Sequence, residues 1–220
     1  MQETSRGVPA RRPGRPRKAE AGDTKEALLR AAVRLFAQHG YVGTSIRAIA
    51  REVELSESVL YAHFENKQAV FAAALARYGP QASTGALNNV DPGLAETDPP
   101  RFLVALVDAF LKDWDREESR LLISLVTRDG LLHSDALRDA LTSMRSYATG
   151  LFAEWLAADQ IPERLGPADR LAFSFTGPIG LARVLHLHAD ASPAERSQAR
   201  ADVQQHVDFF TKAVFRRKDQ

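Results

Sequence analysis

The stretch that decides the fold reads LFAQHGYVGTSIRAIAREVELSESVLYAHFENK and covers residues 35–67. Gly40 occupies a position that accepts a left-handed backbone, which predicts that a first helix ends there. Ser45 and Ser56 can each cap a short helix that follows them. Two very short helices joined by a turn of about three to four residues are typical of a helix-turn-helix.

Helical periodicity continues on both sides of this stretch. Upstream, apolar residues recur at the spacing of one helix face, at Leu28, Ala31, Ala32, Leu35 and Phe36. Downstream, Asn66 can cap a fourth helix. No segment shows the alternation that is typical of a strand. The sequence therefore predicts an all-α protein of about nine helices.

The remaining chain divides at a segment rich in Gly, Pro and Asn. We expect a disordered basic arm over residues 1–22 and a helix-turn-helix domain over 23–78. A linker or loop should follow over 79–98, and a larger ligand-binding and dimerisation domain over 99–220. Asp98 before Pro99 predicts one helix start, and Ser192-Pro193-Ala194-Glu195 forms a capping box that predicts the last.

Composition excludes several classes of function. The chain has 220 residues and no Cys, so a disulfide scaffold, a thiolate zinc site and cysteine catalysis are excluded. No apolar run has the length of a membrane span, and the basic N-terminal segment is followed by no apolar stretch of the kind found in signal peptides. We expect a cytoplasmic protein with no membrane partner.

Charge is distributed unevenly along the chain. Residues 1–78 hold 13 Lys and Arg against 8 Asp and Glu, whereas acidic residues are in excess over residues 79–220. A basic front favours contact with a polyanion there. Arg15 and Arg17 lie in a Gly-Arg-Pro segment that looks like an AT-hook, which inserts Arg into a narrow minor groove. A generic basic tail that adds only phosphate affinity is the equal alternative.

Residues 24–75 resemble the N-terminal domain of the TetR family of bacterial regulators. The resemblance rests on the spacing of Phe36, Gly40, Thr44, Ile46, Ile49 and Ala50, and on the Leu-Tyr-x-His-Phe-x-x-Lys run at residues 60–67. The C-terminal two thirds of the chain match only in the number and length of helices. The resemblance implies a homodimer that binds a palindromic double-stranded DNA operator.

Candidate DNA contacts follow from the motif. In a helix-turn-helix, the N-terminal residues of the second short helix face the base edges. Arg47 is the side chain here that can grip a guanine through two hydrogen bonds. By resemblance, Tyr61, His63 and Lys67 contact phosphates. The full candidate set is Thr44, Ser45, Arg47, Ser56, Glu57, Ser58, Tyr61, His63, Lys67, Arg15 and Arg17.

The segment 167–188 is apolar on more than one side, which is typical of a helix buried on two sides. One side would face a partner subunit and the other a cavity. The resemblance implies that the last two helices form the dimer interface, which we expect at Leu171, Phe175, Ile179, Val203, Val207, Phe210 and Val214. An aromatic-lined pocket for an apolar small molecule is expected at Phe110, Trp114, Met144, Tyr147, Phe173 and Thr176. Ordinary packing within one subunit is the alternative for each of these residues.

The sequence supports no set of nucleophile, base and orienting group, no phosphate-binding glycine loop and no metal-binding motif. We therefore expect neither an enzyme nor a cofactor. The leading hypothesis is a repressor that an apolar ligand releases from its operator. An architectural DNA-binding protein without a ligand is the second hypothesis, and a small helical enzyme is a distant third.

Overall fold

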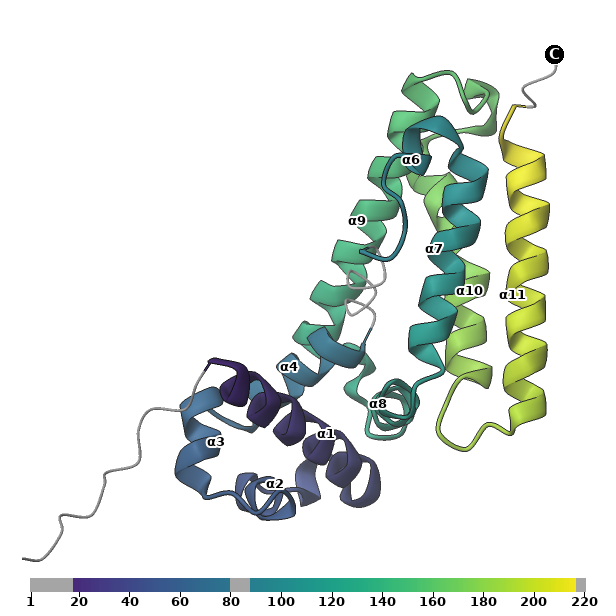
Figure 1. Cartoon of the computed structure of the whole chain (residues 1–220). Coiled ribbons are helices and arrows are strands. Elements are labelled where there is room, and N and C mark those ends of the chain that lie inside the picture. Colours follow the sequence, from purple (N-terminus) through teal and green to yellow (C-terminus); the bar gives the residue numbers. More distant parts are fainter. Residues whose placement is uncertain (1–17, 80–87, 217–220) are drawn as a thin grey trace, which may run out of the picture.

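The computed structural model describes residues 18–79 and 88–216 of the chain (Figure 1). Within these ranges it contains ten α-helices, two single-turn 3₁₀ helices and no strand. The predicted all-α fold is confirmed. None of the described helices combines the length and the apolar character that a bilayer crossing needs.

The N-terminal helices form where the sequence places caps. The Ser45 hydroxyl accepts a hydrogen bond from the Ala48 N–H (3.1 Å), and the Asn66 side chain accepts one from Ala69 N–H (2.8 Å). Gly40 has a φ of 77° and interrupts the first helix where the sequence predicted its end, but the helix resumes after the kink and continues to Gly43. The four helices are α1 (Lys18–Gly43), α2 (Ile46–Glu52), α3 (Glu57–His63) and α4 (Lys67–Tyr78).

The first of these helices starts inside the segment that was expected to be disordered. Because α1 begins at Lys18, residues 18–22 belong to a helix, and the described structure says nothing of the arm that precedes them.

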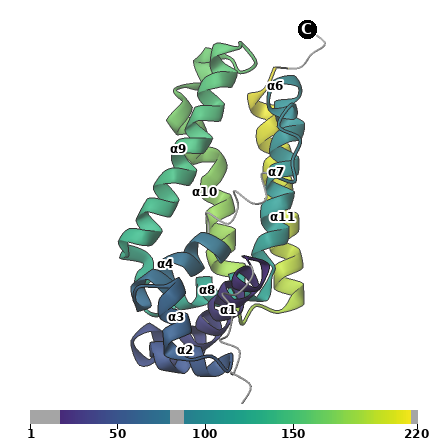
Figure 2. The ribbon, with the colours of Figure 1, turned by 60° about the vertical axis from the view of Figure 1, so that its left-hand side comes forward.

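The C-terminal part is a bundle of long helices that stands on the N-terminal helices (Figures 1 and 2). Asp98 caps its first long helix, and Ser192 forms the expected capping box with Glu195 at the start of the last. The helices are α6 (Leu94–Thr97), α7 (Pro99–Trp114), α8 (Glu117–Arg128), α9 (Asp135–Ala157), α10 (Ala168–His186) and α11 (Pro193–Val214), with the 3₁₀ helices η2 (Leu131–His133) and η3 (Glu163–Leu165).

Two hydrophobic cores hold these elements, and α8 belongs to the N-terminal one. Leu122, Leu125 and Val126 of α8 pack into the same buried cluster as Leu28, Phe36 and the other apolar residues of α1–α4. The second core joins α7, α9, α10 and α11. Because α8 follows α7 after only Asp115 and Arg116, one short connection links the two cores.

The structure corrects the predicted dimer interface. Each of the seven side chains expected there is at most 8% exposed and packs in the second core of a single subunit, which leaves it no surface for a second copy. They are Leu171, Phe175, Ile179, Val203, Val207, Phe210 and Val214. The physical reason is that the apolar face of α11 packs against α7 and α10 within the core of one subunit.

The opposite side of α10 and α11 carries the exposed apolar residues. Phe173 is 66% exposed, Leu181 60%, Leu185 52% and, on α11, Phe209 72%. Val184 adds a further partly exposed side chain to the same helix. On α10 these residues recur at intervals of three, four and eight, which places them along one face. This surface, from Phe173 to Leu185 with Phe209, is called the outer face below.

Candidate functional site

The first turns of α2 and α3 present polar side chains to solvent. Arg47 and Glu57 form an ion pair across the two helices, with 3.4 Å between Nε and Oε1 and exposed side-chain fractions of 72% and 46%. The Ser56 and Ser58 hydroxyls lie 2.7 Å apart. Tyr61, one turn further along α3, is 54% exposed. The predicted residues that share this exposed surface are Ser45, Arg47, Ser56, Glu57, Ser58 and Tyr61.

The structure corrects the expectation for Thr44. Its side chain is only 2% exposed, and its hydroxyl lies within hydrogen-bond distance of the Gly40 carbonyl (2.9 Å) and the Leu35 carbonyl (3.1 Å). Thr44 therefore ties the end of α1 to the start of α2 and has no side-chain atom free for DNA.

The Lys67 side chain also forms hydrogen bonds within the protein. Its ammonium donates to the carbonyls of Tyr41 (2.8 Å), Thr44 (2.9 Å) and Val42 (3.3 Å), and it lies 4.7 Å from the centre of the Tyr41 ring. An ammonium has three N–H donors, and three carbonyls take them. In this structure Lys67 has a structural role, because the cation satisfies carbonyls that the end of α1 leaves unpaired. Its expected contact with phosphate stays a prediction.

The remaining predicted contacts are His63, Arg15 and Arg17. His63 is half-buried at the end of α3, with its ring 6.3 Å from that of Phe64. Arg15 and Arg17 lie outside the described residues. Val42 was not predicted as a contact, and it is 90% exposed in the last turn of α1. A single apolar residue at a helix end gives no sequence signal, so only the structure reveals its exposure.

A polar latch joins α8 to α1. The Arg128 guanidinium donates to the carbonyls of Ala37 (2.7 Å) and Phe36 (3.1 Å), and also to the carboxylate of Asp129 (2.8 Å). The other Asp129 oxygen accepts the Tyr41 N–H at 2.7 Å. Burial raises the pKa of Asp129, but the hydrogen bonds from Arg128 and the Tyr41 N–H outweigh it, so that the pKa lies below its usual value. We call Arg128 and Asp129 the α8 latch.

Gly40 is required at this contact for two reasons. Its positive φ disfavours other residues, and a Cβ there would lie 3.2 Å from an Asp129 carboxylate oxygen. The kink in α1 thus brings the backbone close to the latch. No sequence pattern could have revealed the latch, because its partners are about ninety residues apart in the chain.

An apolar cavity lies between α7, α9 and α10. Five of the six residues predicted for a pocket line it, namely Phe110, Trp114, Met144, Tyr147 and Thr176. The sixth, Phe173, is corrected, because it is 66% exposed on the outer face. Further lining comes from Leu103, Leu106, Val107, Ala148, Leu151, Phe152, Phe175, Ile179 and Gly180.

The cavity is small and almost free of polar groups. Its volume is about 60 Å³, whereas sites for drug-sized molecules measure about 300–1,000 Å³. The Thr176 hydroxyl is occupied by the Ala172 carbonyl at 2.7 Å. A ligand of ordinary size would therefore have to displace flexible lining side chains such as Met144.

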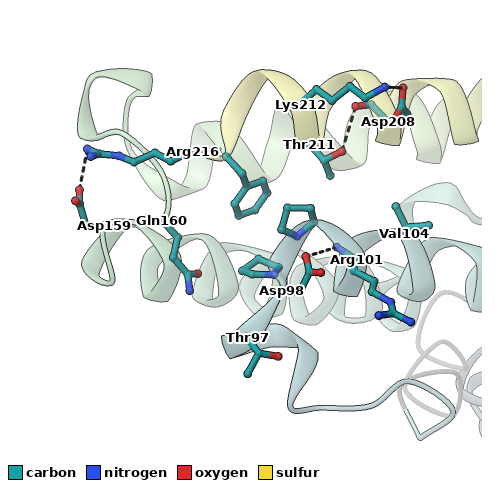
Figure 3. Close-up of a pocket in the computed structure, with 13 residues that line it drawn as sticks. Thr97, Asp98, Arg101, Val104, Asp159, Gln160, Asp208, Thr211, Lys212 and Arg216 are labelled. Atoms are coloured by element: carbon teal, nitrogen blue, oxygen red, sulfur yellow. Dashed lines mark hydrogen bonds and ion pairs between the residues drawn. The ribbon is translucent and has the colours of Figure 1, made fainter. Parts of the chain in front are cut away.

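A wider hollow of about 740 Å³ lies at the far end of the bundle, between α7, α11 and the turn after α9 (Figure 3). Its charges are largely matched within the protein. Asp159 pairs with Arg216 (2.8 Å), and Lys212 pairs with Asp208 (2.7 Å). Asp98 caps α7 through the Arg101 N–H (3.2 Å). The apolar cavity is the better candidate for a ligand site. In the described part of the chain no three His, Asp or Glu side chains gather in a way that could hold a metal ion.

Comparison with known proteins gives a match for the N-terminal region. Residues 28–74 fit the family model described as "Bacterial regulatory proteins, tetR family". An uncharacterized HTH-type transcriptional regulator of Bacillus subtilis, YerO, is 29% identical over 107 residues, which cover 49% of this chain and 36% of the relative. A probable acrEF/envCD operon repressor of Escherichia coli is 41% identical over 54 residues, or 24% of each chain. The chain thus matches only about a quarter to a third of the length of these relatives.

Similarity of fold extends over most of the chain. The solved structure of SmeT in complex with triclosan superimposes with a TM-score of 0.69 at 18% identity, covering 89% of this chain and 93% of that one. The N-terminal helices and the C-terminal bundle are therefore arranged as in that structure.

Proposed function

We propose that this chain, which belongs to the TetR family of bacterial regulatory proteins, is a dimeric transcriptional repressor that a small ligand releases from its operator. The observation that carries the proposal is the exposed polar surface made by the first turns of α2 and α3. In a helix-turn-helix this surface enters the major groove. The two other parts of the proposal, dimerisation and ligand response, rest on the outer face and on the α8 latch.

DNA contact divides between the two helices. Ser56, Glu57 and Ser58 at the start of α3 face the base edges, and Tyr61 reaches a phosphate. The ion pair with Glu57 holds the Arg47 guanidinium beside the first turn of α3, from where it can grip a guanine. The same pair neutralises the carboxylate that would otherwise repel the DNA backbone.

The outer face supplies the dimer interface. Exposed apolar side chains that gather on one side of a helix mark interaction sites, and α10 shows Phe173, Leu181 and Leu185 along one side. Gly177 lies in this face, and a Cβ added there would meet no atom within 4 Å. A second copy related by two-fold symmetry can therefore approach α10 closely.

Ligand response follows from the short connection between α7 and α8. A ligand that enlarges the cavity displaces Phe110 and Trp114 of α7. Because α8 begins three residues after Trp114, the displacement of α7 also moves α8. The latch then carries the displacement of α8 into α1 through Arg128 and Asp129. DNA is released because the ligand binds the two arrangements unequally. SmeT, a neighbour in fold, is itself described in complex with the small molecule triclosan.

The test of DNA binding uses salt and two variants. The affinity of the dimer for DNA should fall roughly 10³–10⁵-fold between about 50 and 200 mM salt if it contacts six to ten phosphates.

Tyr61→Phe should weaken binding to all sequences alike if the Tyr61 hydroxyl contacts a phosphate. Arg47→Ala should cost about 10- to 100-fold on the preferred site and relax the base preference at one position of each half-site. Fluorescence anisotropy with labelled duplexes measures all three.

A matched control is available on the bundle. Arg145 is exposed on α9, far in sequence from the helix-turn-helix, and Arg145→Ala should leave operator affinity unchanged. A flat salt dependence, or equal losses for Arg145→Ala and Arg47→Ala, would contradict DNA contact through α2 and α3.

A further inference from the structure

A buried cation lies against Trp114, one of the residues that line the apolar cavity. Arg183 on α10 is only 5% exposed, and within the described ranges its Nε and Nη1 atoms are buried and have no hydrogen-bond partner. Burial lowers the pKa of Arg183 to about 9, and attraction by Asp113 partly offsets this effect. The group therefore stays charged at neutral pH. The guanidinium contacts the Trp114 ring and is attracted by Asp113, but two of its donor atoms stay without an acceptor inside the protein, which is unfavourable.

Arg183 adjoins the cavity wall. Its guanidinium carbon lies 4.6 Å from the centre of the Trp114 ring, and Trp114 lines the cavity together with Phe110, whose ring stacks on it at 5.9 Å. Along α10, Arg183 follows the cavity residues Ile179 and Gly180 by four and three positions. It therefore shares their helix face and lies one turn nearer the α8 end of the bundle.

Other polar atoms at this end also lack partners. The indole Nε1 of Trp114 and the Oδ2 atom of Asp113 are buried and unpaired in the described part of the chain. The other Asp113 oxygen lies 3.4 Å from an Arg116 nitrogen. The negative charge of Asp113 is thus shared between two arginines, and the cluster of Asp113, Arg116 and Arg183 keeps a net positive charge. Two unpaired donors, from Arg183 and Trp114, suit an anionic acceptor.

We propose that the cavity takes a ligand with an apolar body and a carboxylate head, and that Arg183 binds this head. This inference rests on the proposed sensor role of the cavity and narrows its ligand from an apolar molecule to an amphipathic acid. The body lies among Phe110, Met144 and Tyr147, and the head reaches the end of α7. Because α8 begins next to Trp114, the charged head acts directly on the helix that carries the latch.

Matched acids and amides test this proposal. Benzoate, 2-naphthoate and octanoate are each compared with the corresponding primary amide, which has nearly the same shape and no charge. Calorimetric titration of the full-length protein should show at least one acid bound about 10- to 100-fold more tightly than its amide, as expected of a charge-assisted hydrogen bond. Arg183→Met should reduce this preference to about twofold or less, whereas Arg145→Met should keep it. Absence of any acid preference, or its survival in Arg183→Met, would overturn the proposal.

Stability of the free protein provides a second measurement. Replacing Arg183 together with its partner, as Asp113→Asn with Arg183→Met, removes the buried charge without leaving the carboxylate unpaired, and should raise the Tm of the free protein by about 3–10 °C. An unchanged or lower Tm, or a variant that does not fold, would show that Arg183 is structural and would overturn the proposal. DNA binding is measured on the same samples. Acid preference without DNA binding contradicts the repressor proposal alone, and DNA binding without acid preference contradicts this inference alone.

Discussion

Replacing Leu181 by aspartate should separate the dimer into monomers and lower operator affinity by about 10²–10⁴-fold. Leu181 is 60% exposed on the outer face. In a two-fold interface each substitution places two carboxylates in one apolar contact, where a charge without a partner is strongly unfavourable. The fold itself should not suffer, because the side chain is largely in solvent in the single subunit. Analytical ultracentrifugation and an operator titration measure the two effects.

The control for this variant is the same substitution on another helix. Leu141 is 44% exposed on α9, outside the outer face, and Leu141→Asp should remain dimeric with normal operator affinity. A Leu181→Asp protein that stays dimeric and binds the operator normally would contradict the assignment of the outer face.

Phe210→Asp should unfold the C-terminal bundle rather than split the dimer. Phe210 is 7% exposed, and its ring lies 5.1 Å from that of Phe175 and 5.8 Å from that of Phe152. An unpaired carboxylate there should cost at least about 4–5 kcal/mol, which is comparable to the roughly 5–15 kcal/mol that stabilises a typical domain. Circular dichroism during urea unfolding measures the loss.

The adjacent residue gives the matched comparison. Phe209 is 72% exposed on the outer face, so Phe209→Asp should leave the fold intact and weaken the dimer. A Phe210→Asp protein that is folded and monomeric, together with a Phe209→Asp protein that remains dimeric, would contradict this account. The dimer interface would then lie on the face that contains Phe210, as the sequence predicted, and not on the outer face.

The sequence could not predict which side of α10 is buried within one subunit. Along α10, Leu171, Phe175 and Ile179 form one apolar stripe, and Phe173, Leu181 and Leu185 form another. Periodicity shows that both sides of the helix are apolar, but it does not say which side meets the same subunit. The packing of α9 and α11 against α10 decides, because the first stripe is buried in the core that these helices share. The second stripe is left exposed.

Local signals were more reliable than long-range ones. The caps at Ser45, Asn66, Asp98 and Ser192 were predictable because their partners lie within four residues. Ser56 occupies the expected cap position of α3 without making the side-chain hydrogen bond, since its hydroxyl pairs with that of Ser58.

Residue type does not show which polar residues of the motif stabilise the fold and which remain exposed for DNA. Thr44 and Lys67 have the polar atoms of DNA-binding residues, yet both are used to close the end of α1. Arg47 and Tyr61 have similar chemistry and remain exposed. Which polar groups of a short motif serve the fold depends on carbonyls that become unpaired only when the helices are arranged, so the sequence alone could not separate the two sets.

The most direct test of the central claim is selection of binding sites from a random duplex library by the purified full-length protein. We expect enrichment of a palindrome whose half-sites lie about 10–10.5 base pairs, or a multiple of this distance, apart, because two α3 helices related by the dimer axis enter successive major grooves. Enrichment of a single unpaired half-site, or of no sequence at all, would contradict a dimeric operator-binding repressor.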